Sequence, residues 1–587
     1  MPVPVSPAPA PPAADQPAAP APLPPLAPPR RGDAVAAWLV AFVLLAAFAG
    51  VRDVWDADEG RYGTVALDMV RSGDYLTPRE HGLRFLDKPP LVYWMACGAY
   101  AVFGPTPFAA RLPCLVAGAT LALLGFLFAA RWTGSRRAGF AAAVVVATSG
   151  GGMGFSRTVT MDMGLAASIA GALYAGLRAL ASPALGWRAL LGACVGAGLL
   201  VKGPLAAVAT ALVAFAWAAA GLSWRATLRT LVAPTAWATA LVVAAPWYVL
   251  MERANPGYLE HFVTYEHFRR FREPGHRDFA PVWLYAAVLP LFLLPWTLLL
   301  PRARMPQPVA AASRRPVPAH RLAWAWVVVL LVLYSAGRNR LFTYALPMFL
   351  PLAVLAGARL AALLEDAAGT REARRGPMLT GLVVLLGGFA WAALMLSPWG
   401  PTQGDDPQAR APGSAYGVAL RFAAAGLPLA TVGLWLGRSP RARLAGLAVA
   451  AASMWWGIDL AAAQFDAQRS PRELASTLVR EAGPDDLVVC VDLLPQGLRF
   501  AQPDLWVAVA GKQPEIVEPW ATKDGAGRLF SLDALAAMWD GPRRIVLVAR
   551  EKKAARWLAR GGRALAQGLS GAQRADLVVV ENRPRAP

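Results

Sequence analysis

The sequence predicts a polytopic α-helical membrane protein with a small α/β domain at its C-terminal end. Only 16% of its 587 residues are charged, whereas soluble proteins average about 25%. Long apolar runs recur from Ala34 to Phe465, and such runs suit helices that cross a bilayer core of about 30 Å. From Ser470 onward the apolar runs shorten to the length of β-strands, which indicates a change of architecture.

The N-terminal segment is rich in proline and alanine and cannot form a packed core, so we expect a disordered tail over residues 1–33. Arg30 and Arg31 precede the first apolar run and place this tail in the cytoplasm. The run Ala34–Gly50 lacks a small-residue cleavage pattern and is followed by many other apolar runs. We therefore interpret it as an uncleaved first span, which puts the loop at residues 51–90 on the outer face.

Residues 34–469 form the predicted transmembrane domain, with thirteen spans in all. After Ala34–Gly50, the predicted spans are Leu112–Ala130, Ala138–Gly154, Met163–Ala181, Ala189–Val201, Pro204–Gly221, Leu231–Met251, Pro281–Leu300, Leu322–Ala336, Leu341–Leu364, Met378–Leu396, Val418–Gly437 and Leu444–Phe465. The apolar segment Leu91–Gly104 is short for a span at a rise of about 1.5 Å per residue. We expect it to be half-inserted on the outer face; the alternative is a fourteenth span.

Arginine-bearing connections support this topology, because positive residues mark cytoplasmic loops. With thirteen spans all five arginine groups fall on the cytoplasmic side. The groups are Arg131, Arg136 and Arg137; Arg225 and Arg229; Arg302, Arg304, Arg314, Arg315 and Arg321; Arg371, Arg374 and Arg375; and Arg438, Arg441 and Arg443. The C-terminal domain then lies outside, which is the periplasm if the chain spans a bacterial inner membrane.

Residues 470–587 alternate between strand-like and helix-like stretches, a pattern typical of a small α/β domain. The predicted strands are Leu487–Val491, Leu505–Val509, Arg544–Val548 and Asp576–Val580, and the predicted helices are Pro471–Glu481, Leu532–Trp539 and Lys552–Arg560.

The net charge of +20 does not indicate a nucleic-acid partner, because excess arginine is expected in cytoplasmic loops and no RNA-binding or helix-turn-helix signature is present. The four cysteines, Cys97, Cys114, Cys194 and Cys490, are scattered without CxxC spacing. We therefore expect neither a disulfide framework nor a cysteine metal site, and no organic cofactor.

Charged residues of both signs collect at the predicted outer ends of the spans. They are Asp58, Glu59, Arg61, Asp87 and Lys88 in the first loop, then Asp162, Lys202, the segment Tyr265–Phe271 with Glu266, His267 and Arg270, and finally Arg338 and Arg340. Ionisable residues in such positions mark a functional site in a membrane protein. Carboxylates beside several fixed cations suit an anionic, phosphate-bearing substrate, and one carboxylate can act as a base.

Each member also has a structural interpretation. Asp58 and Glu59 suit the first turn of a helix, and Lys88 before two prolines suits a helix start with a snorkelling lysine. Asp162 and Lys202 can form a structural ion pair. The convergence of all these residues on one face is the stronger argument for a site.

The first loop resembles a known family along almost its whole length. The stretch DEGRYGTVALDMVRSGDYLTPREHGLRFLDKPPLVYW, from Asp58 to Trp94, resembles the first periplasmic loop of the bacterial aminoarabinose transferases that modify lipid A. Shorter motifs follow in that family's order: ARLP with Arg111, TVTMDM with Asp162, VKGP with Lys202, YEHFRRF, and RNRLFTYALP. These transferases belong to the wider group of the protein O-mannosyltransferases, whose fold is that of the C-type membrane glycosyltransferases.

The resemblance implies transfer of a sugar from a polyprenyl phosphate donor to lipid A or another envelope acceptor at the outer face. The catalytic carboxylate would fall on Asp58, with Glu59 beside it, and Lys88 would hold the donor phosphate. Further phosphate-binding residues would be Arg61, Lys202, Arg270, Arg338 and Arg340, and the cavity would also include Asp162, Asp87, Glu266 and Tyr344.

The same resemblance implies a divalent metal held by Asp87 and His267. The family has glutamate before the lysine, whereas this chain has Asp87, so the shorter side chain weakens the expectation of a metal contact. A lone histidine such as His267 is also more often structural than a ligand.

Three other functions remain open at the level of the sequence. The enzyme could transfer mannose or another hexose to protein or glycan. It could instead be a transporter of lipid-linked sugars, although the chain has no internal repeat and its charges lie at one face rather than mid-membrane. A scaffold that uses the α/β domain to bind partners would leave the polar site unexplained.

Overall fold

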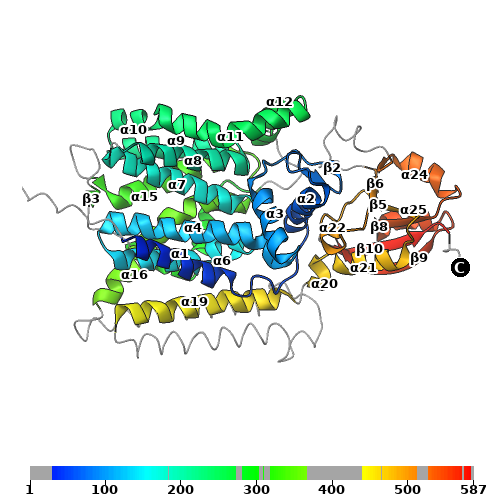
Figure 1. Cartoon of the computed structure of the whole chain (residues 1–587). Coiled ribbons are helices and arrows are strands. Elements are labelled where there is room, and N and C mark those ends of the chain that lie inside the picture. Colours follow the sequence, from blue (N-terminus) through cyan, green and yellow to red (C-terminus); the bar gives the residue numbers. More distant parts are fainter. Residues whose placement is uncertain are drawn as a thin grey trace, which may run out of the picture.

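The computed structural model describes residues 30–182, 184–272, 280–302, 308–309, 317–366, 439–463, 466–511, 527–571 and 574–583. Most of the predicted N-terminal tail and the two predicted spans Met378–Leu396 and Val418–Gly437 lie outside these residues. A helical bundle and a C-terminal sheet lie at opposite ends of the molecule, with the first loop between them (Figure 1).

Long apolar helices build the bundle. They are α1 (Arg31–Ala46), α4 (Pro107–Thr133), α5 (Arg136–Ala147), α6 (Gly150–Ser156), α7 (Asp162–Ala181), α8 (Leu185–Lys202), α9 (Leu205–Ala219), α11 (Pro234–Ala254), α14 (Leu284–Phe292), α15 (Ala319–Ala336), α16 (Leu346–Asp366) and α19 (Pro440–Ala462). Six helical segments in the described part of the chain are long and apolar enough to cross a membrane, or seven if the bent pair α5 and α6 is one span. The chain is therefore a multi-pass membrane protein.

Several predicted spans differ in form from the observed helices. The predicted span Ala138–Gly154 bends by 54° between α5 and α6. The predicted span Pro281–Leu300 is α14 followed by the 3₁₀ segment η2 (Trp296–Arg302). The segment predicted to be half-inserted forms α3 (Leu91–Phe103), an apolar helix of 13 residues. It is shorter than the helices that could cross a membrane and is not one of the six candidate spans.

The first loop folds into a compact layer over one end of the bundle. Its main helix is α2 (Asp58–Ser72), which begins with two acids, ends with Arg71 in its last turn and stops at Gly73 in the left-handed region. This charge order suits the helix dipole, and glycine is the residue that adopts φ +71° without strain. A hairpin of β1 (Arg79–Glu80) and β2 (Leu83–Arg84) follows α2.

Short elements complete the two ends of the bundle. Near the first loop lie α12 (Tyr258–Glu260), the π-helix η1 (His261–Arg269), α13 (Arg270–Arg272) and η3 (Phe342–Ala345), and the opposite end carries α10 (Trp224–Leu231) and the pair β3 (Pro308–Val309) and β4 (Val317–Pro318).

The C-terminal part is a six-stranded mixed sheet with the order β7-β6-β5-β8-β10-β9. The strands are β5 (Leu487–Val491), β6 (Ala508–Ala510), β7 (Leu529–Phe530), β8 (Ile545–Arg550), β9 (Arg563–Gly571) and β10 (Arg574–Glu581), with helices α20 (Asp466–Arg469), α21 (Arg472–Glu481), α22 (Leu498–Ala501), α24 (Leu532–Trp539) and α25 (Glu551–Leu558). The first four strands in this order are parallel to one another. The strand β10 is antiparallel to both of its neighbours, β8 and β9.

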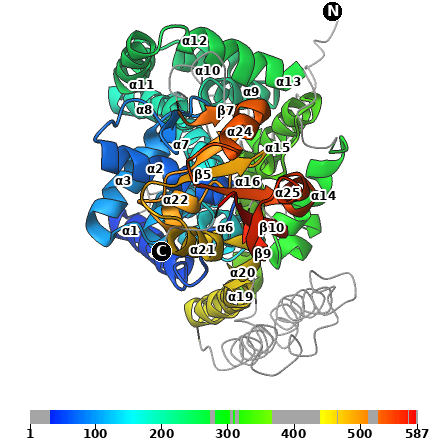
Figure 2. The same ribbon diagram turned by 90° about the vertical axis from the view of Figure 1, so that its right-hand side faces the viewer.

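Helices cover both faces of this sheet (Figure 2). Alternate residues of β5 enter separate apolar cores, with Val488 and Cys490 packed on the face of α21, and Val489 and Val491 on the face of α24 and α25. A strand buried on both faces has no polar alternation, which is why the sequence shows β5 as a continuous apolar run.

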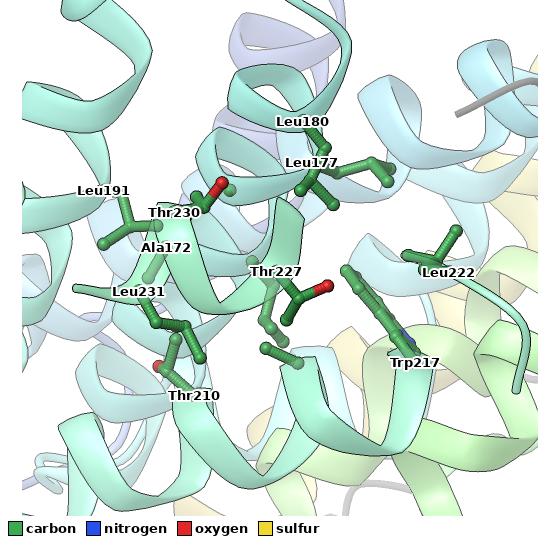
Figure 3. A pocket seen from close by; sticks show the side chains of 13 residues that line it. Ala172, Leu177, Leu180, Leu191, Thr210, Trp217, Leu222, Thr227, Thr230 and Leu231 are labelled. Atoms are coloured by element: carbon green, nitrogen blue, oxygen red, sulfur yellow. The ribbon is translucent and has the colours of Figure 1, made fainter. Parts of the chain in front are cut away.

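A small apolar pocket lies within the bundle between α7, α8, α9 and α10 (Figure 3). Its walls include Leu177, Leu191 and Trp217, and its cavity volume is only about 20 Å³. The nearest lining residue on α7 is Ala172, ten residues from Asp162, which is about 15 Å along a helix. The pocket is therefore separate from the polar end of the bundle.

Candidate active site

The first turn of α2 presents Asp58 to solvent. The Asp58 side chain is 49% exposed, and its Oδ1 lies 4.0 Å from Nη1 of Arg61. Arg61 is almost buried, and its Nε lies 3.5 Å from Oε2 of Glu80 in the hairpin. One guanidinium therefore lies between an accessible carboxylate and a buried one.

Glu59, next to Asp58 in the chain, points the other way and is buried. Its carboxylate accepts hydrogen bonds from Arg52 Nη1 at 2.7 Å and from Arg111 Nε and Nη2 at 2.9 and 3.0 Å. Burial alone would raise the pKa of Glu59, but Arg111 and Arg52 outweigh it and lower the pKa to about 2. Both oxygens are thus committed to the protein, which fits a positioning role better than contact with substrate.

Lys88 lies immediately before α3 and beside the π-helix. Its Nζ is 3.4 Å from Oε2 of Glu266, whose side chain is only 4% exposed, and it also donates to the carbonyl of Asp87 at 3.1 Å. The structure therefore brings together residues that are 178 positions apart. The Lys88 side chain is 16% exposed, so it is not fully buried.

Asp162 and Lys202 meet as an ion pair at the ends of α7 and α8. The Lys202 ammonium also lies 4.5 Å from the ring centre of Tyr344, in cation–π contact. The sequence allowed a structural ion pair between Asp162 and Lys202, and the structure contains this pair. Its position at the polar end of the bundle also suits a role in binding.

The arginines predicted to bind phosphate are in different situations. Arg340 donates through Nε to the carbonyl of Ser335 at 3.0 Å and through Nη1 to the carbonyl of Ala280 at 2.7 Å. Arg338 is exposed, and Arg270 lies in α13. The contacts of Arg340 join the last turn of α15 to the segment that precedes α14.

The electrostatic environment of Tyr62 links several of these carboxylates. Burial raises the pKa of Tyr62, and the carboxylates of Asp58, Asp162 and Asp87 raise it further. Three acids from two different elements and the loop after β2 therefore act on one phenol of α2. This convergence, together with Lys88 and Lys202, makes a site of mixed charge at one end of the bundle.

The residues suggested for a metal do not fit one in this arrangement. His267 Nδ1 lies 2.8 Å from the carbonyl of Phe262, and its Nε2 lies 3.4 Å from the carbonyl of Lys202. Within the described ranges there is no group of three or more potential His, Cys, Asp or Glu ligands.

Of the residues that hold the first loop in place, the sequence pointed to Arg111 through the ARLP motif but did not indicate Arg52 or Arg499. Arg52 and Arg111 clamp Glu59, and Arg499 pairs with Asp68. Arg499 carries no local signal, because its partner is 431 residues away.

The fold and the placement of the charges define the class of this protein. A bundle with spanning helices, a polar loop layer at one end and a mixed sheet beyond it matches the fold of the C-type membrane glycosyltransferases. The crystal structure of ArnT from Cupriavidus metallidurans bound to undecaprenyl phosphate superposes with a TM-score of 0.77 at 21% identity, covering 95% of this chain and 99% of that one.

Sequence comparison identifies the family. A relative from Edwardsiella ictaluri, an undecaprenyl phosphate-alpha-4-amino-4-deoxy-L-arabinose arabinosyl transferase, is 30% identical over 377 residues, 63% of this chain and 67% of the relative. A relative of the same name from Pseudomonas aeruginosa PAO1 is 35% identical over 351 residues, 58% of this chain and 61% of the relative. The profile of the dolichyl-phosphate-mannose-protein mannosyltransferases matches residues 87–250. The chain belongs to the family of undecaprenyl phosphate-aminoarabinose arabinosyl transferases.

Proposed function

We propose that this protein transfers a 4-amino-4-deoxy-arabinose-like sugar from a polyprenyl phosphate donor to lipid A or a related envelope acceptor. The observation that carries this proposal is the convergence of one accessible carboxylate, Asp58, with Lys88, Lys202 and Arg61 at one end of a membrane bundle. Membership in the arabinosyl transferase family gives the reaction its sugar and its donor class.

In this mechanism Lys88 binds the phosphate of the donor. A compact ammonium that is partly exposed beside Glu266 can accept the charge that grows on the leaving phosphate. Lys202 and Arg61 extend the cationic surface, and we assign Arg270 and Arg338 to phosphate binding from the family resemblance. The polyprenyl tail lies between the spanning helices, where it keeps its apolar surface out of water.

Asp58 orients the acceptor and takes up a proton where the acceptor is a hydroxyl. A lipid A phosphate is already anionic at neutral pH, so with that acceptor the carboxylate acts mainly by orientation. Glu59 takes a different role: held by Arg52 and Arg111, it fixes the first turn of α2 so that Asp58 faces the acceptor. Asp162, Asp87, Glu266 and Tyr344 form the remaining wall.

The proposed topology has thirteen spans, a cytoplasmic N-terminus and a periplasmic C-terminal α/β domain over residues 470–587, in a bacterial inner membrane. The predicted tail boundary at residue 33 moves to the start of α1 at Arg31, and the transmembrane domain extends to residue 469. Support comes from the arginine groups in the connections, and from the position of α10 and β3 at the end of the bundle opposite the first loop (Figure 1).

Mass spectrometry of lipid A, glycans and secreted proteins tests the proposal in cells with and without this protein. We expect an aminoarabinose-sized addition on lipid A phosphate that disappears with the gene and with Asp58→Asn, and returns with the wild-type chain. An exposed acid far from the site, changed in Asp504→Asn, serves as a control that keeps the addition. Loss of sugar confined to glycoproteins would assign the chain to hexose transfer instead. Unchanged envelope chemistry would overturn the transferase proposal.

A further inference from the structure

Glu80 is a buried carboxylate that contacts Arg61, the arginine beside the candidate catalytic residue Asp58. It ends β1, where the hairpin packs against α2, and only 8% of the residue is exposed. Its Oε2 lies 3.5 Å from Nε of Arg61, and Nη1 of the same guanidinium lies 4.0 Å from Oδ1 of Asp58. Arg61 therefore links Glu80 to Asp58.

The setting of Glu80 is unfavourable for stability. Its Oε1 is buried and has no hydrogen-bond partner among the described residues, and buried polar atoms are nearly always paired. By contrast, the buried Glu581 in the C-terminal sheet contacts Arg544 through Oε2 and Arg563 through Oε1. A buried carboxylate with one unpaired oxygen beside Arg61 costs stability. This indicates that Glu80 serves the function of the site rather than the packing of the loop.

The electrostatic surroundings of Glu80 agree with this interpretation. Burial raises the pKa of Glu80 to about 7, Arg61 opposes the shift, and the carboxylates of Asp87 and Asp68 add to it. The charged groups acting on Glu80 are thus Arg61 and Asp68 from α2 and Asp87 from the loop after β2. Its charge changes within the range in which bacteria grow.

We infer that Glu80 is a positioning residue for the transfer reaction, holding the Arg61 guanidinium away from full pairing with Asp58 and oriented toward the donor phosphate. This inference rests on the proposed function. With Glu80 ionised, Arg61 is shared between two carboxylates, and Asp58 stays available to the acceptor. With Glu80 neutral, Arg61 pairs more closely with Asp58, so its guanidinium is no longer directed at the donor phosphate.

The test compares the purified full-length protein with Glu80→Gln, which keeps the shape and removes the charge. Transfer is measured with a polyprenyl phosphate-aminoarabinose donor and lipid A between pH 5.5 and 8.5, and the wild-type rate is divided by the variant rate at each pH. We expect a ratio near one below pH 6, rising to about 10-fold to 100-fold above pH 8. Protonation of the substrates affects both proteins equally and cancels in this ratio. The rise of the ratio with pH therefore reflects the ionisation of a group in the protein.

Three further variants separate positioning from folding. Glu80→Asp restores the charge and recovers part of the rate at pH 8. In an Arg61→Gln background, Glu80→Gln causes no further loss, because the two residues act as one unit. Glu581→Gln breaks a buried ion pair of the C-terminal sheet, and it lowers thermal stability while leaving the shape of the pH profile unchanged.

The outcomes are distinguishable. A ratio that does not change with pH, or an equal loss in the Arg61→Gln background, overturns the inference about Glu80 while the transferase proposal stands. Absence of aminoarabinose transfer by the wild-type protein, with correctly folded material and both substrates present, overturns the proposed function itself.

Discussion

At the level of single residues, two adjacent carboxylates differ because of their surroundings. The Asp58 side chain is 49% exposed, whereas Glu59 is 3% exposed and held by two arginines. Breaking a buried ion pair leaves an uncompensated charge, whereas neutralising an exposed acid costs little stability. The two positions should therefore separate function from folding.

We expect Asp58→Asn to lower transfer by about 100-fold or more, the usual contribution of an acid–base or orienting carboxylate, with an unchanged unfolding temperature. Glu59→Gln should instead lower the free energy of unfolding by about 3–5 kcal/mol, because Arg52 and Arg111 lose their partner. Turnover and thermal unfolding in detergent are measured side by side. Full turnover by Asp58→Asn would remove the catalytic assignment.

Lys88 gives a second prediction at this scale. Replacing it by methionine keeps the apolar stem and removes one charge-assisted hydrogen bond to phosphate, worth about 1.5–3 kcal/mol, so donor affinity should fall by about 10-fold to 100-fold. Binding of undecaprenyl phosphate is measured by titration calorimetry. Lys88→Arg should restore affinity only in part, because a planar guanidinium does not fit a site built for a point charge beside Glu266. Undiminished affinity in Lys88→Met would place the phosphate elsewhere.

At the level of elements, the sequence predicted what depends on local patterns. The acids at Asp58 and Glu59 anticipated the first turn of α2, and the two prolines after Lys88 anticipated the start of α3. The hairpin β1–β2 was missed, since its strands have two residues each and its turn is His81–Gly82 rather than a sequence with asparagine or aspartate. The link between Arg61 and Glu80 depends on how that hairpin lies on α2, which no local pattern encodes.

The same hairpin contacts the C-terminal part through a buried histidine. His81 Nε2 lies 3.2 Å from the carbonyl of Gln496, and the side chain of Arg528 donates to the carbonyl of His81 at 3.2 Å. Burial lowers the pKa of His81 to about 3, with Arg499 adding to the shift. The folded state therefore favours the neutral ring, and stability is lost as pH falls below the unfolded-state pKa of 6.5.

Acid should consequently loosen this contact. At pH 5 the loss is about 2 kcal/mol, because the folded state fails to bind a proton that the unfolded state binds. Hydrogen exchange at residues 81–82 and 496–497, corrected for its intrinsic pH dependence, should rise relative to pH 7.5. His81→Gln cannot take up the proton and should show no such pH-dependent rise. Equal behaviour of the variant and the wild type would exclude His81 as the cause.

At the level of the whole molecule, the C-terminal part holds the first loop. Asp56 Oδ1 accepts from the backbone N–H of Gly497 at 2.7 Å, Thr64 Oγ1 donates to the carbonyl of Gln496 at 2.8 Å, and Arg499 pairs with Asp68. These contacts join residues more than 400 positions apart. The segment between β5 and β6, including α22, therefore supports the site, which the composition of the chain could not indicate.

Gly60 is where this support is most sensitive to side-chain size. A Cβ added at Gly60 would lie 2.0 Å from Asp56 Oδ1 and 2.7 Å from the backbone nitrogen of Gly497, so Gly60→Ala should push α2 and the C-terminal part apart at a cost of about 1–3 kcal/mol. Gly98→Ala is a matched control, because a Cβ at Gly98 in α3 meets nothing within 4 Å. We expect Gly60→Ala to speed proteolysis of the first loop and to reduce transfer by lowering kcat, while Gly98→Ala does neither. If the two variants behave alike, the C-terminal part is not a clamp on the first loop, and the position of Asp58 depends on the bundle alone.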